Sequence, residues 1–134
     1  MADLLKDYRE KQFLYKQETY EVVGSCMEVH KCLGKGLLEV VYKDAIEIEL
    51  KSRMISFVRE KRFEIRYKTV LLNHFFFADF VVFDKIVLEI KATQKGFSEE
   101  YEKQLINYLA ISELKVGLLV NFGESSLKYK RIVL

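Results

Sequence analysis

The sequence predicts an α/β fold in which helices cover a mixed β-sheet. Two helical patterns come first, strand patterns occupy the middle of the chain, and a third helical pattern precedes two final strands. Strands joined by short turns are antiparallel, whereas a helix between two strands makes a crossover that leaves them parallel. This order therefore predicts helices packed on a sheet with both kinds of pairing.

Length and composition favour a single globular domain. The chain has 134 residues, of which 50% are hydrophobic and 31% are charged. We expect one domain over 1–134, in which 1–17 form a helical extension. The net charge of +2 is too small to indicate nucleic-acid binding by itself. No apolar run is long enough for a membrane span, and the charged amino terminus argues against secretion, so we expect a cytoplasmic protein.

Apolar residues at spacings of three and four predict two helices in the first part of the chain. The first is expected over 18–33, with one side formed by Val22, Val23, Cys26, Met27, His30 and Leu33. The second is expected over 37–53, after a break at two glycines, with an apolar side formed by Leu37, Leu38, Val41, Ala45, Ile46 and Ile48. We interpret His30 as an interior histidine, and both Cys26 and Cys32 as buried reduced thiols.

Strands are predicted over 55–60, 62–67, 75–83, 86–92, 114–121 and 127–133. A third helix is predicted over 98–112, with Ser98 as N-cap and two acidic residues in the first turn. Since this helix connects the strands at 86–92 and 114–121, we expect those two strands to be parallel neighbours.

One basic cluster lies in the predicted strands. It contains Arg59, Lys61, Arg62, Arg66 and Lys68. Glu60 and Glu64 interrupt the cluster, so a solvated strand face is the favoured interpretation and a nucleic-acid footprint the weaker one.

Three charged residues stand in apolar strands, where an ionised group is costly unless it is paired or coordinated. They are Asp79, Glu89 and Lys91. Glu89 and Lys91 are two residues apart and therefore share a face. A two-residue turn at 84–85 would pair Asp79 with Ile90 and point the carboxylate to the opposite face. A common site thus requires a three-residue turn or a bulge.

Two carboxylates on one face favour a metal site, because hard oxygen ligands suit Mg²⁺ or Mn²⁺. A metal that lowers the pKa of bound water, beside a lysine that holds this water or the charge on phosphorus, suits phosphodiester hydrolysis. The alternative is a structural ion pair of Asp79 or Glu89 with Lys91.

The same residues resemble a known family. Asp79 followed by EIK at 89–91 is similar to the D…(D/E)-x-K core of the PD-(D/E)XK nuclease superfamily, although Ala78 stands where many members have proline. The sequence GLLEVVY at 36–42 matches the G-x-x-E-x-x-Y motif of the GxxExxY family, and QLINY at 104–108 resembles the Q-x-x-x-Y helix motif. The resemblance implies a restriction-endonuclease-like core, a central mixed sheet flanked by helices, with the site at one end of the sheet.

The resemblance also implies roles. Mg²⁺ or Mn²⁺ would be held by Asp79, Glu89, Glu39 and the backbone carbonyl of Ile90. Lys91 would orient or activate water, and Gln104 and Tyr108, one helical turn apart, would hold Lys91 or a phosphate. Simpler alternatives remain: Glu39 in a first helical turn is favourable through the helix dipole, and Tyr42 and Tyr108 suit core aromatics with a hydrogen-bonded hydroxyl.

The expected function is a magnesium-dependent nuclease that acts on DNA or RNA. The alternative is a catalytically inactive module on the same fold that binds nucleic acid or protein, since a fold does not establish turnover. A domain of this size offers little surface for gripping a duplex. We therefore expect a homodimer, formed through the strand at 127–133 or the helix at 3–16.

Overall fold

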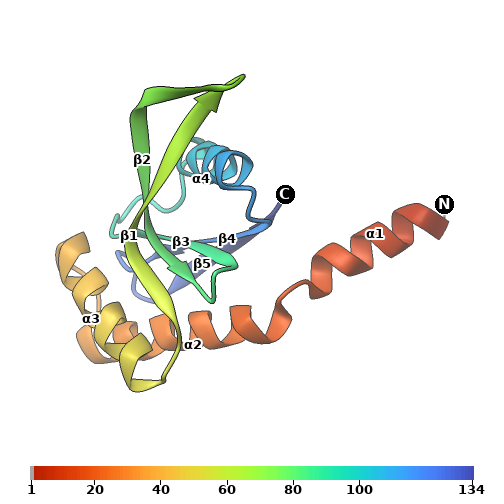
Figure 1. Cartoon of the computed structure of the whole chain (residues 1–134). Coiled ribbons are helices and arrows are strands. Elements are labelled where there is room, and N and C mark those ends of the chain that lie inside the picture. The colour runs from red at the N-terminus through yellow and green to blue at the C-terminus, as the bar shows by residue number, and fades with distance from the viewer. Residues whose placement is uncertain (1) are drawn as a thin grey trace.

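A computed structural model describes residues 2–134, which form a five-stranded sheet with helices on both faces (Figure 1). The strands lie in the order β1-β2-β3-β4-β5, and only β3 and β4 pair in parallel among the described residues, as predicted. The elements are α1 (Ala2–Phe13), α2 (Lys16–Leu33), α3 (Glu39–Ser52), β1 (Phe57–Tyr67), β2 (Val70–Val82), β3 (Ile86–Lys91), α4 (Glu99–Ser112), β4 (Val116–Asn121) and β5 (Lys128–Val133).

Each face of the sheet has its own hydrophobic core. On one face, α2 and α3 pack against the strands, and Ile46 and Leu50 join Leu88 in a single buried cluster. On the other face, Leu105 and Leu109 of α4 pack with Val87 and Leu119. Strands β3 and β4 are buried on both faces, which explains their almost wholly apolar sequences.

The predicted apolar side of the second helix is correct at Ile46 but wrong at most other positions. Helix α3 begins at Glu39, so Leu37 and Leu38 precede it, and Leu38 is 72% exposed. The buried side is instead formed by Tyr42, Ile46 and Leu50, which are spaced by four residues. In α2, likewise, Met27 and Leu33 are exposed and Val29 is buried.

The strands predicted at 55–60 and 62–67 are one strand, β1, and β2 starts five residues earlier than predicted. Together they form a long antiparallel hairpin that projects beyond the rest of the sheet (Figure 1). The hairpin turns at Lys68, which has a left-handed φ of 57°. Inside β1, Glu60 is also left-handed, with φ 53°. The sequence carries no glycine at either position to signal these backbone conformations.

Side chains of the β1–β2 hairpin pack into different cores on the two sides of Glu60. Phe63 and Ala78 belong to the core under α4, whereas Phe57 and Phe80 belong to the core under α2 and α3. Strict alternation would place Ala78 and Phe80 on the same face. The alternation is therefore interrupted at Asp79, directly across the hairpin from the left-handed Glu60.

The turn between β2 and β3 contains three residues. A three-residue turn or a bulge was the condition for Asp79 and Glu89 to share one site. Val82 pairs with Ile86, so the turn comprises residues 83–85, and both Phe83 and Asp84 have positive φ values.

The predicted N-cap of α4 is confirmed: the Ser98 hydroxyl accepts a hydrogen bond from the backbone N–H of Tyr101 at 3.3 Å.

The amino-terminal helix α1 has no buried residue. Its carboxyl end is tied to β5 by Arg131, whose guanidinium donates to the backbone carbonyls of Lys11 and Leu14.

Across residues 2–134, no helix combines the length and apolar character of a membrane span. Cys26 is buried as expected, but Cys32 is exposed, because it lies on the outer side of α2.

Candidate functional site

Asp79 and Glu89 are interlocked between β2 and β3. The backbone N–H of Asp79 donates to Oε1 of Glu89 at 3.0 Å, and the backbone N–H of Ile90 donates to Oδ2 of Asp79 at 2.7 Å. The last pair in this ladder is Phe80 with Leu88, so the two carboxylates replace the backbone hydrogen bonds where the strands separate. The acids thus meet across a gap between strands at one end of the sheet.

The second oxygen of Asp79 contacts a residue that sequence analysis missed. Nζ of Lys43, on α3, lies 3.0 Å from Oδ1 of Asp79, and each side chain is 13% exposed. The same ammonium also pairs with Glu60. Lys43 lies one helical turn after Glu39, so the i, i+4 spacing was a signal that could have placed both residues on one face.

Glu39 reaches this region because the G-x-x-E-x-x-Y segment builds a short loop before α3. Gly36 has φ 98°, which favours glycine, and Glu39 is the first residue of the helix. The Tyr42 hydroxyl donates to the Gly34 carbonyl at 2.6 Å and accepts from the backbone N–H of Leu37 at 3.2 Å. Tyr42 is therefore a structural residue that fixes the loop, in agreement with the simpler interpretation.

Lys91 takes no part in the predicted ion pair. Its ammonium lies 4.6 Å from the ring centroid of Tyr101, a cation–π contact. Within the described part of the chain, no salt bridge joins Lys91 to Asp79 or Glu89, so the structural ion-pair alternative is not what the fold contains. Tyr101 is a second residue that sequence analysis missed.

The two residues of the Q-x-x-x-Y segment are placed differently. Tyr108 stacks on Phe76 with ring centroids 4.3 Å apart, and its pKa is raised by burial and by the charges of Glu89 and Asp79. Gln104 is exposed, and among residues 2–134 no side-chain hydrogen bond connects it to Lys91. Tyr108 thus borders the acids, whereas Gln104 faces solvent.

The electrostatics of the site favour a further positive charge. Burial, followed by repulsion from Asp79, raises the pKa of Glu89 to about 8. The same two causes raise the pKa of Glu39. Lys43 has the opposite preference: burial lowers its pKa, but hydrogen bonds to Glu60 and Asp79 outweigh burial and raise the pKa overall.

The donor set fits a hard divalent cation in its chemistry. The region holds four carboxylates, from Glu39, Glu60, Asp79 and Glu89, against two ammonium groups, from Lys43 and Lys91. If all are ionised, a net charge of about −2 remains, which Mg²⁺ or Mn²⁺ would neutralise. In the part of the chain that the structure covers, however, no three acidic, histidine or cysteine side chains are arranged as a metal-binding group. Metal binding by these residues would require their side chains to rearrange.

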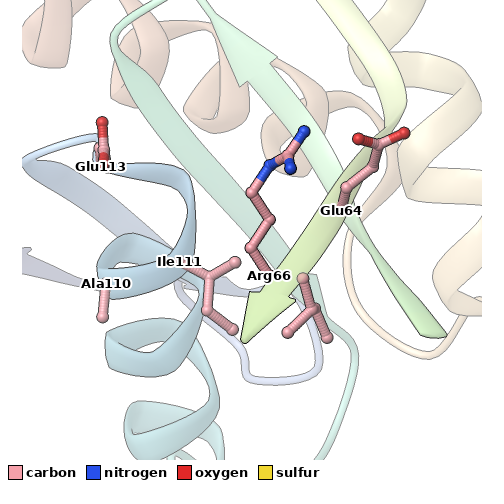
Figure 2. A pocket seen from close by; sticks show the side chains of 6 residues that line it. Glu64, Arg66, Ala110, Ile111 and Glu113 are labelled. Atoms are coloured by element: carbon pink, nitrogen blue, oxygen red, sulfur yellow. The ribbon is translucent and has the colours of Figure 1, made fainter. Parts of the chain in front are cut away.

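One pocket of the molecule lies away from these residues. It has a volume of about 540 Å³ and is formed by the end of β1 and the carboxyl end of α4 (Figure 2). Figure 2 shows Glu64 and Arg66 on one side of it, and Ile111 and Glu113 on the other. None of the predicted site residues lines this pocket.

His30 is an interior histidine, as predicted. Its Nε2 lies 3.0 Å from the backbone carbonyl of Glu124, and the residue is buried. It packs against Phe122, which in turn stacks on Tyr42. His30 therefore supports the core beneath the site and contacts none of its acids.

A family model and a solved structure each match most of the chain. No curated protein matches the chain significantly. A solved structure titled "Crystal structure of SSO0001" is 24% identical, with a TM-score of 0.57 over 89% of this chain and 59% of that one. This likeness concerns the fold, and the chain spans about 59% of the length of that structure. A family model described as the PD-(D/E)XK nuclease superfamily matches residues 16–132. The chain belongs to the PD-(D/E)XK nuclease superfamily.

Proposed function

We propose that the protein is a divalent-metal-dependent nuclease that hydrolyses phosphodiester bonds of DNA or RNA. The observation that carries the proposal is the interlocked pair of Asp79 and Glu89, with Lys91 two residues beyond Glu89 on the same strand. The superfamily membership supports it, because nuclease activity is the activity for which the superfamily is named.

In this proposal, Mg²⁺ or Mn²⁺ is held by Asp79, Glu89, Glu39 and the carbonyl of Ile90. When bound, the metal would activate a water molecule and stabilise charge on the phosphate. Lys91 positions that water, and the Tyr101 ring holds the Lys91 side chain in place. Tyr108 borders the acids and would donate a hydrogen bond from its hydroxyl to a substrate phosphate, while Gln104 contacts the substrate from the exposed side of α4.

A cleavage panel tests this function. Labelled single- and double-stranded DNA and RNA are incubated with Mg²⁺, with Mn²⁺ and with EDTA. We expect cleavage of at least one substrate in the presence of metal, and loss of that cleavage in Lys91→Ala. Lys95→Ala, at an exposed position just beyond β3, is the matched control and should keep full activity. Equal cleavage by wild type and Lys91→Ala would point to a contaminant and overturn the proposal.

The second candidate function is an inactive binding module. The ion pair between Lys43 and Asp79 favours it, because an ammonium that is largely shielded from solvent already neutralises a proposed metal ligand. Under this alternative, metal ions neither bind nor change stability, while nucleic acid or protein binds without being cleaved. Calorimetry with Mn²⁺ near neutral pH separates the two functions.

A further inference from the structure

The outer face of the β1–β2 hairpin presents aromatic rings to solvent. Phe75 is 39% exposed and Phe77 is 51% exposed. Phe76 between them stacks on Tyr108 of α4, and Ala78 is buried under the same helix. Since side chains alternate along a strand, Phe75 and Phe77 project from the side opposite α4. Adjacent exposed phenylalanines on one strand face indicate a contact surface.

A basic side chain of β1 lies on the same outer face. Arg62 pairs across the hairpin with Phe77, and its guanidinium carbon lies 3.5 Å from the ring centroid of Phe75. Glu64, opposite Phe75, carries a negative charge, and the pairing of the two strands shifts register between Glu64 and Arg66, where this surface ends. Over residues 2–134, Arg62 forms no salt bridge, so its charge is not neutralised by a carboxylate.

This outer face leads directly into the acid site. Phe75, Phe77 and Asp79 are alternate residues of β2, and Asp79 reaches Lys43 of α3 on this side. A strand rises about 3.3 Å per residue, so Phe77 precedes Asp79 by about 7 Å. The outer face is therefore continuous along β2 with the acid site.

We propose that the outer hairpin face, formed by Arg62, Phe75 and Phe77, binds single-stranded nucleic acid and leads it toward Asp79. This inference rests on the proposed function and specifies its substrate. Unpaired bases stack on aromatic rings and on arginine planes, and nearby positive charge attracts the backbone. A duplex keeps the faces of its bases stacked internally, so the exposed phenylalanines favour a single strand.

Binding without turnover tests the surface. Fluorescence anisotropy in EDTA compares a labelled single strand of mixed sequence with the matching duplex. We expect the single strand to bind more tightly, and Phe75→Ala and Phe77→Ala each to weaken it by roughly tenfold. Phe77→Leu keeps apolar bulk while it removes the ring, and should weaken binding similarly. Tyr20→Ala, at a 74% exposed aromatic of α2, is the matched control and should leave affinity unchanged.

The outcomes distinguish this surface from the proposed function. Ring-dependent binding without metal-dependent cleavage would support the surface and count against the nuclease. Cleavage that persists while Phe75→Ala and Phe77→Ala leave single-strand affinity unchanged would overturn the surface and keep the nuclease. Tighter binding of the duplex, or no binding of either form, would also overturn the surface. Circular dichroism and the unfolding midpoint verify that each variant is folded.

Discussion

Lys43 Nζ lies 3.0 Å from Oδ1 of Asp79, which places an ammonium group on the carboxylate that the proposed metal would use. The same lysine pairs with Glu60, so one positive charge serves two acids. A metal ion and this ammonium repel each other at such distances. Lys43 and the metal should therefore compete for Asp79.

Lys43→Met should increase the affinity for Mn²⁺. The substitution keeps most of the side-chain length and removes the competing charge, so we expect affinity to rise about three- to tenfold. Titration followed by the electron paramagnetic resonance signal of free Mn²⁺ measures this change. Lys103→Met, at an exposed position on α4, is the control. Weaker Mn²⁺ binding by folded Lys43→Met would contradict competition.

The metal-free protein should lose stability as pH rises from about 5 to about 8. Burial and repulsion from Asp79 raise the pKa of Glu89 from 4.5 to about 8, so the native state retains a proton that the unfolded state releases. This contribution to the free energy of unfolding, of a few kcal/mol, is fully present below the pKa of Glu89 in the unfolded state. It is lost as pH rises through the pKa of Glu89 in the folded state. Urea unfolding in EDTA at several pH values measures it.

Glu89→Gln provides the control for that pH profile. Glutamine cannot release a proton, so the fall in unfolding free energy should become much shallower in this variant. The raised pKa of Glu39 acts in the same direction and leaves a smaller slope. An unchanged profile in Glu89→Gln would assign the pH dependence to other groups.

Tyr42→Phe should destabilise the fold by about 0.5–1.5 kcal/mol. The substitution removes the hydroxyl that accepts from the Leu37 N–H and donates to the Gly34 carbonyl, so the loop before α3 loses both hydrogen bonds. Stacking on Phe122 is retained. Chemical denaturation measures the loss, and hydrogen exchange at Leu37 should become faster. Tyr20→Phe, on the exposed side of α2, should change neither; equal midpoints for Tyr42→Phe and wild type would refute this role.

The sequence predicted most of the architecture because apolar periodicity follows the two cores directly. The parallel pairing of β3 and β4 followed from the helix between them, and α4 followed from its N-cap at Ser98. The errors arose where periodicity was ambiguous. Helix α3 contains apolar residues on several sides, so the choice between Ile48 and Leu50 depended on the start of the helix at Glu39.

The acidic residues of the site were easier to predict from the sequence than the residues that contact them. Asp79 and Glu89 were conspicuous because charge is costly in an apolar strand. Lys43 was not, since a lysine on a half-exposed helix is ordinary, and its contact with Asp79 depends on how α3 packs against the sheet. The reversal of faces at Glu60 and Asp79 was equally hidden, because left-handed backbone at Glu60 has no sequence signal.

Calorimetric titration of the wild type, Asp79→Asn and Glu89→Gln with Mn²⁺ near neutral pH tests the central claim most directly. The claim is that the interlocked carboxylates form a metal site. We predict saturable Mn²⁺ binding by the wild type, and a loss of at least about tenfold in each folded variant, because each removes a charged oxygen ligand. Absence of binding by the wild type, or equal affinity in all three proteins, would contradict the metal site.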